Sequence, residues 1–323
     1  MVTLLCMPYI LKKGTRIIND VYSKNKLKMK FKLKNILAVM AITLSLASCT
    51  KNEGVAVTPP NDELSDVLKF QEVENATHVI ELYKHMSSLE QGYNEVVFRI
   101  KDKATNQYIK NATATWTPLM HMNSMAMPMT HSCPKSAIEK VSVDGEVYSG
   151  YLVFQMPQSG ASAATSTDYW ELKIDYTING TNFSMTDRVN VPASTKQRVT
   201  TFTGTDNVKY VVAYCDPHHP ALGINDMVAG IWKMQNMMTF PVVNNFKLKI
   251  DPRMPSMGNH GSPNNVDLTQ TVADDLYNGK LSLTMTGLWR INLQLLNASD
   301  VVLKGETVTD VAPSSSIYFE IEF

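Results

Sequence analysis

Five sets of residues recur in this chain in one order, and this internal duplication constrains the fold more than any other feature. The pairs are Gly92–Ile100 with Gly223–Ile231, His131–Pro134 with His260–Pro263, Tyr148–Gly150 with Tyr277–Gly279, Met156 with Met285, and Trp170–Ile174 with Trp289–Leu293. The second, third and fourth pairs share one offset of 129 residues. Independent anchors in a fixed order rarely arise by chance, so we interpret the body of the chain as two copies of one module.

Each copy is predicted to consist of short β-strands. Runs of β-branched and aromatic residues between polar turns are Val96–Ile100, Ala112–Trp116, Gly150–Met156 and Trp170–Tyr176, then Tyr210–Tyr214, Val228–Met234, Phe246–Ile250, Lys280–Met285 and Trp289–Leu295. This spacing predicts an all-β chain of two tandem immunoglobulin-like β-sandwich domains, each of about 110 residues. Copy 1 is expected over 69–195 and copy 2 over 206–323, with the connection near 193–205.

The N-terminal sequence predicts export. Lysines at alternate positions over 24–34 precede an apolar run, Ile36–Leu44, that is shorter than the about 20 residues of a membrane span. The run leads into Leu46-Ala47-Ser48-Cys49, which resembles the lipobox where bacterial lipoproteins are cut and lipidated on cysteine. An ordinary signal peptide with an incidental cysteine is the alternative.

Residues 1–48 are therefore read as a signal region, with Met29 a natural start, and 49–68 as a lipidated tether. Residues 1–48 hold nine of the 30 basic and one of the 30 acidic residues, so the remainder has 21 basic and 29 acidic residues. A net charge near −8 argues against nucleic-acid binding. We expect a cell-envelope protein anchored in the membrane through the lipid on Cys49, at the outer membrane, on its periplasmic face or surface.

In both copies a strand is expected to lead into a loop with an unusual number of methionines. The first loop, 118–134, holds the candidate ligands Met120, His121, Met122, Met125, Met127, Met129, His131 and Cys133. The second loop, 252–263, holds Met254, Met257 and His260. Seven of the 15 methionines after Cys49 lie in these loops, among Pro, Ser, Asn and Gly, where a core stripe is not expected.

Thioether sulfur is a soft, neutral donor that favours Cu(I), and imidazole adds a nitrogen ligand. In an extended segment Met125, Met127 and Met129 project to one side, with His121 and His131 flanking them to close the site. The alternative is packing, because methionine commonly fills gaps in cores. Met156 and Met285 alternate with strand residues and are interpreted as core.

Three further features leave alternatives open. The run Cys215-Asp-Pro-His218-His219 is either a metal-binding segment or a polar turn. Met234, Met237 and Met238 either line the second site or pack beside Trp232. An oxidising compartment permits a disulfide between Cys133 and Cys215, which sequence does not decide.

Catalytic signatures are missing from the sequence. It has no Gly-rich phosphate loop, no Gly-x-Ser-x-Gly and no His-Glu-x-x-His. Its carboxylates are scattered and not paired near the His-bearing loops, so general acid–base catalysis has no obvious site. We expect a protein that is not an enzyme.

The second copy combines Met254-Pro-Ser-Met257-Gly, Tyr277-x-Gly279 and Gly287-x-Trp289, and these motifs resemble the YtkA-like (FixH-related) family. The resemblance covers Gly223–Leu295 well and Gly92–Ile174 more loosely. Copy 1 departs by a longer loop and by an insertion over 157–167, and copy 2 has Asn259 before His260. The resemblance implies small extracytoplasmic immunoglobulin-like domains that handle copper for oxidase maturation or efflux.

The expected function is an envelope lipoprotein that binds Cu(I) for transfer or sequestration. It would exchange copper with a donating or accepting envelope protein. The alternative is a structural or adhesive immunoglobulin-like surface lipoprotein that docks a partner protein and binds no metal. In that case the methionine side chains are buried and their sulfurs point apart.

Overall fold

The computed structural model describes residues 63–85 and 88–323. The signal region, the lipidation residue Cys49 and most of the tether lie outside these residues. The described residues all belong to one compact unit. The part of the chain that the structure describes contains no helix long and apolar enough to cross a membrane. The described residues are all-β, as expected, with one short 3-10 turn among them, η1 (Pro255–Met257).

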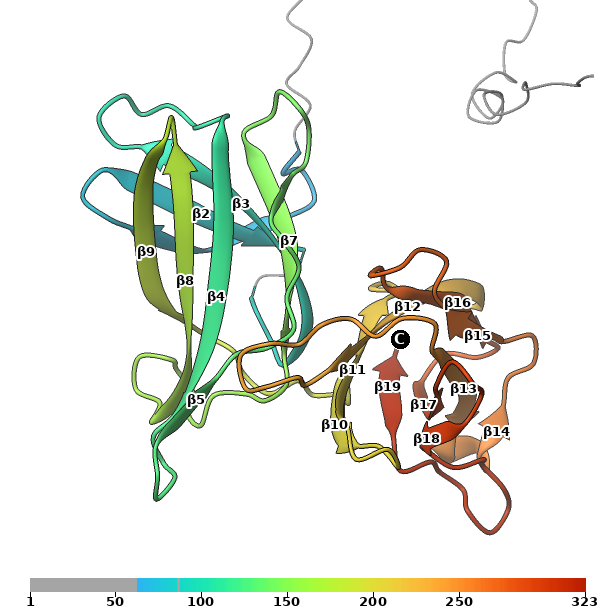
Figure 1. Ribbon diagram of the computed structural model, residues 1–323. Coiled ribbons are helices and arrows are strands. Elements are labelled where there is room, and N and C mark those ends of the chain that lie inside the picture. The colour runs from blue at the N-terminus through green and yellow to red at the C-terminus, as the bar shows by residue number, and fades with distance from the viewer. Residues whose placement is uncertain (1–62, 86–87) are drawn as a thin grey trace, which may run out of the picture. The chain divides into compact units, whose positions relative to one another are not determined.

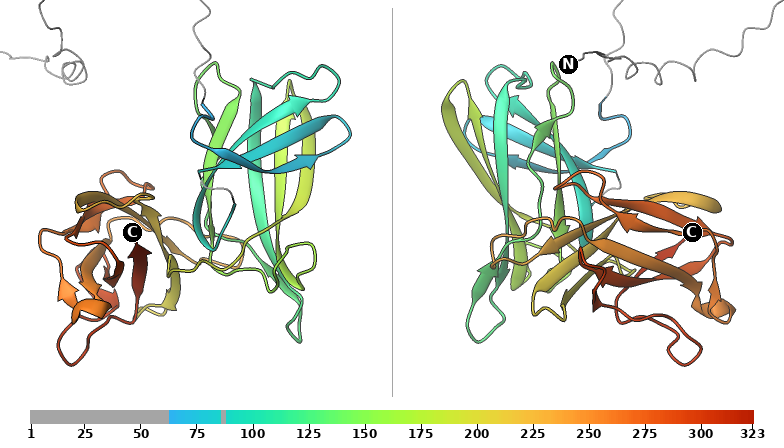
Figure 2. Two further views of the ribbon diagram at one scale, coloured as in Figure 1. Left: turned by 180° about the vertical axis from the view of Figure 1, so that it is seen from behind. Right: turned by 45° about the vertical axis from the view of Figure 1, so that its right-hand side comes forward.

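The first half consists of two antiparallel sheets packed face to face (Figure 1). One sheet has the order β1 (Leu68–Glu74), β2 (His78–Lys84), β3 (Gly92–Asp102), β7 (Val147–Phe154), β6 (Glu139–Lys140). The other has the order β5 (Met129–His131), β4 (Ala112–Met122), β8 (Asp168–Ile178), β9 (Thr181–Val189). Figure 2 shows this half from behind, with the blue strands β1 and β2 toward the viewer.

The strands of the second half belong to one continuous sheet. Its order is β10 (Val199–Thr203), β11 (Lys209–Asp216), β12 (Gly223–Lys233), β16 (Tyr277–Leu283), β15 (Val266–Thr269), β13 (Lys247–Met254), β17 (Leu288–Leu296), β18 (Val302–Lys304). In addition, β14 (His260–Gly261) pairs with β13 and β19 (Tyr318–Glu322) pairs with β17. Because β15 pairs with both β16 and β13, the two layers join at one edge into a barrel-like sheet.

Period-two alternation explains how the strands build the cores. Along β8, Trp170, Leu172, Ile174 and Tyr176 are buried, and the residues between them are only partly covered. Burying one such large apolar side chain contributes about 1.5–3 kcal/mol. Each half encloses its own large apolar cluster in this way.

The residues that recur in sequence make recurring contacts. The Trp170 indole N–H donates to the Met156 carbonyl at 2.9 Å, and the Trp289 indole donates to the Met285 carbonyl at 2.9 Å. The hydroxyls of the recurring tyrosines each bridge the backbone before a strand, Tyr148 at Ile109 O and Ala112 N, and Tyr277 at Val243 O and Phe246 N. The same hydrogen bonds therefore recur within each half.

The glycine of each Tyr-x-Gly motif allows close approach of a neighbour. A Cβ added at Gly150 would lie 2.7 Å from the Trp116 ring, and one added at Gly279 would lie 2.4 Å from the Val266 carbonyl oxygen. Neither distance is compatible with a real side chain, which explains why glycine occupies both positions.

Two expected boundaries were wrong. The expected connection, 193–205, contains β10, because Val199 and Phe202 are buried in a strand paired with β11. The first methionine loop was expected to begin at Pro118, but β4 continues to Met122. Alternation continues through this stretch, with Pro118 and Met120 buried, and extends the strand past the point where the methionines suggested a loop.

A smaller apolar cluster joins the two halves. Val153 of β7 packs with Val199, Val211, Trp232 and Phe240 of the second half. This junction is much smaller than either core. Each half therefore depends for its stability mainly on its own interior.

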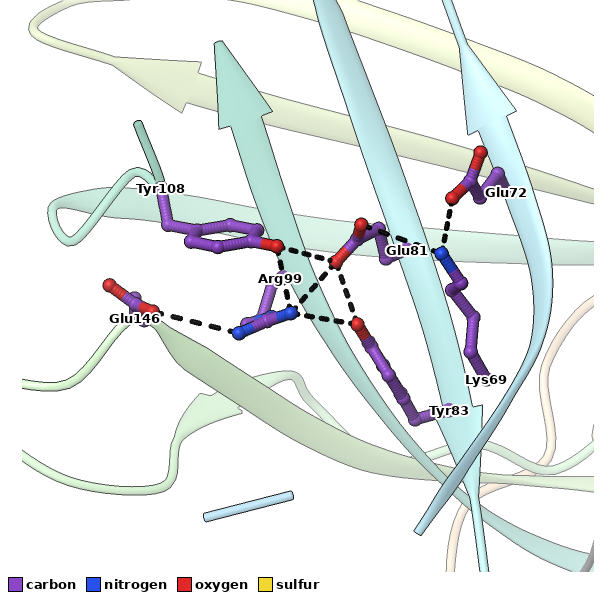
Figure 3. Close-up of polar contacts among 7 residues, drawn as sticks. All are labelled: Lys69, Glu72, Glu81, Tyr83, Arg99, Tyr108 and Glu146. Carbon is purple, nitrogen blue, oxygen red and sulfur yellow. Dashed lines mark hydrogen bonds and ion pairs between the residues drawn. The ribbon is translucent and has the colours of Figure 1, made fainter. Parts of the chain in front are cut away.

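A polar network lies on β2 and β3 of the first half (Figure 3). The Glu81 carboxylate accepts hydrogen bonds from the hydroxyls of Tyr83 at 2.7 Å and Tyr108 at 3.0 Å. The Arg99 guanidinium donates to the same carboxylate oxygen at 3.0 Å, stacks over the Tyr108 ring at 3.8 Å and lies 3.7 Å from Glu146. Its members bond to one another across several segments, so the network stabilises this sheet.

Glu81→Gln is expected to lower the free energy of unfolding at pH 7 by roughly 2–3 kcal/mol, because charge-assisted hydrogen bonds are lost. Burial raises the pKa of the Glu81 carboxyl, but the hydrogen bonds from Tyr83, Arg99 and Tyr108 outweigh burial and lower it. Because the pKa of Glu81 is lower in the folded than in the unfolded protein, its carboxylate contributes stability at pH values above the unfolded-state pKa, near 4.5. This stability is lost as the pH falls through the folded-state pKa.

The measurement is urea unfolding of both proteins between pH 7 and pH 3. The difference between wild type and Glu81→Gln should shrink as the pH drops. Glu72→Gln is the matched control, because its exposed pair with Lys69 should contribute less than about 1 kcal/mol. Equal losses for the two variants would contradict the prediction.

Candidate functional site

The candidate ligands of the first half lie on the hairpin of β4 and β5, near one end of their sheet (Figure 1). Its cross-strand partners are Met120 with His131 and Met122 with Met129. Residues opposite one another on paired strands share a face, as do residues two apart along a strand. These four side chains therefore project from one face, which is the core face because Met120 is fully buried.

An imidazole nitrogen and a soft sulfur donor meet on this face. Nε2 of His131 lies 3.4 Å from the sulfur of Met156, which follows β7 and packs half-buried against the first core. Trp170 positions both residues. Its indole donates to the Met156 carbonyl, and its ring meets the His131 ring edge-on with centroids 5.6 Å apart.

The His131 ring has a defined hydrogen-bonding role. Nδ1 lies 2.8 Å from the Ser132 carbonyl oxygen, which only accepts, so Nδ1 carries the proton. Burial lowers the pKa of the imidazole, the Ser132 carbonyl raises it, and the charge of Lys209 lowers it, with a lowered pKa as the result. The neutral ring then presents an unprotonated Nε2 to the Met156 sulfur.

The sequence interpreted Met156 as a core residue, and its side chain does pack, partly buried, against the first apolar cluster. What the sequence did not predict is that Met156 lies beyond the end of β7, at Phe154, and that its sulfur contacts the His131 ring. The sequence signal that could have pointed to this contact was the recurrence of Met156 and Met285 at one offset, because a core position does not require one residue type.

The expectation that His121 and His131 close one site was wrong. His121 pairs with Thr130 and Tyr169, and the pleat places it on the opposite face of the hairpin from His131. Its ring stacks on Tyr169 with centroids 4.8 Å apart, and its Nε2 lies 3.6 Å from a Glu171 carboxylate oxygen. The two imidazoles cannot bind the same ion.

The remaining methionines of the first loop fall into different environments. Met120 belongs to the core and is fully buried. Met125 and Met127 lie in the turn between the strands, 44% and 81% exposed, so the expected row with Met129 is not formed. Met122 and Met129 form the next cross-strand pair outward from His131, and both are partly exposed.

Cys133 and Cys215, the cysteines among the described residues, are buried free thiols. Cys133 lies in the first core, and burial raises the pKa of its thiol. Burial likewise raises the pKa of Cys215, with the Asp216 charge adding to the effect. Thiolate is the form that binds metals, so the structure does not support Cys133 as a ligand.

The second half separates its candidate ligands. Met254 pairs across the strands with His260, as Met120 does with His131. However, Met254 is buried with its methyl group against Gly287, whereas His260 is exposed. Met257 lies on η1 and is 56% exposed.

His218 of the candidate segment 215–219 lies beside His85 of the first half, with ring centroids 6.4 Å apart. The two rings line a cavity of about 60 Å³ together with Lys84, Glu95 and other residues. Burial lowers the pKa of His218. Within 63–85 and 88–323, no three His, Cys, Asp or Glu side chains are arranged to hold a metal ion, and this pair is no exception.

No family model matches the chain, and no curated protein matches it. A DUF4785 family protein from Legionella pneumophila is similar in structure, with 6% identity, a TM-score of 0.24 and coverage of 71% of this chain and 54% of that one. This chain therefore spans about half the length of the Legionella protein. A chimeric titin Z1Z2 tandem matches with 11% identity, a TM-score of 0.17 and coverage of 73% and 95%. Likenesses this weak identify neither a family nor a function.

Proposed function

We propose that this protein is an envelope lipoprotein that binds Cu(I) on the core face of the β4–β5 hairpin, for transfer or sequestration of copper. The observation that carries the proposal is the 3.4 Å approach of His131 Nε2 to the Met156 sulfur. With the ring proton on Nδ1, neither atom has a hydrogen to share, so lone pairs oppose one another. A soft cation between them replaces this opposition with two bonds.

The separation of the two donors suits an ion bound to both. At zinc sites, imidazole nitrogen lies about 2.0–2.1 Å and sulfur about 2.3 Å from the metal. With these bond lengths and a tetrahedral angle, nitrogen and sulfur are about 3.6 Å apart. The pair therefore needs little rearrangement to bind a cation.

Met122 and Met129 are the proposed further ligands. They follow Met120 and His131 on the same face of the hairpin, and both are accessible to an incoming ion. Thioethers do not form disulfides outside the cytoplasm and have no proton to lose, which suits an exported copper carrier. Met120 packs behind them and supports the hairpin.

The architecture proposed is two tandem immunoglobulin-like modules behind a lipid anchor at Cys49. In the first half, β2-β3-β7-β6 facing β5-β4-β8-β9 corresponds to the A-B-E-D and C′-C-F-G order of immunoglobulin-type sandwiches. The exported location rests on the N-terminal sequence, and the YtkA-like resemblance agrees with copper handling. A tethered carrier of this kind exchanges copper with another envelope protein and needs no catalytic group.

The test is a Cu(I) competition titration of the purified protein against a chromogenic chelator, under anaerobic conditions. We expect one equivalent of Cu(I) to be withheld per chain, with nitrogen and sulfur neighbours in the X-ray absorption spectrum. Excess Zn(II) should displace little of it, because thioethers are poor ligands for the harder ion. Complete transfer of Cu(I) to the chelator would overturn the proposal and favour a structural or adhesive module.

A further inference from the structure

A segment of the second half reaches the His131 hairpin. The backbone N–H of Ser132 donates to the Met237 carbonyl at 2.8 Å. Ser132 follows His131 directly, so Met237 lies beside the proposed copper site. The sequence left two roles open for Met234, Met237 and Met238, and in the structure Met234 and Met237 have different surroundings. Met234 packs against the junction cluster that contains Trp232, whereas Met237 joins the first half's hairpin.

Met237 lies in a tight turn. The backbone N–H of Gln235 donates to the Thr239 carbonyl at 3.0 Å, and that of Met238 donates to the Asn236 side chain at 2.8 Å. Met237 and Met238 are 37% and 45% exposed, so neither is committed to a core. An unbranched side chain with three rotatable bonds is free to swing its sulfur toward a nearby ion.

We propose that Met237 supplies a thioether ligand from the second half to the site of His131 and Met156, so that both halves share one copper site. Three points support this assignment: the 2.8 Å backbone contact beside His131, the partial exposure of the Met237 residue and the softness of thioether sulfur as a donor. The second half's own pair, Met254 and His260, is split between core and solvent. The inference rests on the proposed function.

A shared site couples the halves. An ion bound to ligands from both is held only while the halves remain docked and folded, so binding stabilises both of them. Cu(I) should therefore raise the unfolding temperature of both halves in the wild type. Without the Met237 sulfur, the stabilisation should be confined to the first half.

The test compares Met237→Leu with Met238→Leu, which lies in the same turn and has no assigned role. Leucine has nearly the volume of methionine, so both variants should keep the fold of the wild type. We expect Met237→Leu to weaken Cu(I) binding by about 10–100-fold, the range seen when even a residue that only supports a metal ligand is lost. Its X-ray absorption spectrum should lose sulfur neighbours, and Met238→Leu should match the wild type in both measurements.

A second measurement on the wild type does not depend on any variant folding. In protein labelled at the methionine methyl carbons, Cu(I) should shift the Met237 and Met156 signals and leave Met238 unchanged. If Met237→Leu binds as tightly as the wild type and the Met237 signal does not move, the shared site is wrong and the site of the first half stands. If the wild type itself retains no Cu(I), the proposed function has failed.

Discussion

Replacing His131 by leucine is expected to weaken Cu(I) binding by at least about 100-fold, because the substitution removes the nitrogen ligand that faces Met156. The side chain is 9% exposed and lies against the Trp170 ring, so leucine fills the space without adding a polar group. Competition against a chromogenic chelator measures the change, and unfolding of the copper-free variant checks that the fold is retained.

His121→Leu is the matched control, since the same residue type lies ten positions earlier on the same hairpin. The pleat directs His121 toward Tyr169 on the opposite face, so copper binding should be unchanged. If the two variants lose affinity equally, a site on the core face is contradicted. If neither loses affinity, His131 is not a ligand.

Trp170→Ala and Trp289→Ala are each expected to lower the free energy of unfolding of one half by about 3–5 kcal/mol. Both indoles are fully buried, and each lies in a different apolar core. The small junction cluster joins the cores weakly, so calorimetry should resolve two transitions. Each variant should shift a different one.

Trp170→Phe and Trp289→Phe provide the controls. Each keeps an aromatic ring in the core and loses the hydrogen bond to the Met156 or Met285 carbonyl, which should cost about 1–2 kcal/mol. Similar losses in the free energy of unfolding of the two halves would agree with a duplicated module. One transition that shifts as a whole in every variant would show that the halves unfold together, contrary to this expectation.

Local pattern in the sequence was sufficient for the fold class. Alternation of apolar and polar residues predicted strands such as β8 and β17, and both are present with Trp170 and Trp289 at their buried positions. Strands without strong alternation were missed. β10 was assigned to the connection, because its threonines conceal the buried Val199 and Phe202.

The candidate site was predicted in composition and not in geometry. Methionine and histidine residues do gather at the first hairpin, but the face on which each side chain lies depends on where β4 ends. Because β4 continues past Trp116 to Met122, its successive side chains alternate between the two faces of the hairpin. This alternation places His121 and His131 on opposite faces. A strand boundary that is wrong by a few residues therefore changes which side chains can meet.

The sequence by itself determined the all-β class, the recurrence of five sets of residues in one order and the concentration of methionine and histidine near one hairpin. These properties depend on residues close together in the chain, where period and composition are directly visible. Only the tertiary structure decided that Met156, 25 residues after His131, meets its Nε2, and that Met237 contacts Ser132 across the junction. Such contacts depend on how distant strands pair and pack, which local spacing does not encode.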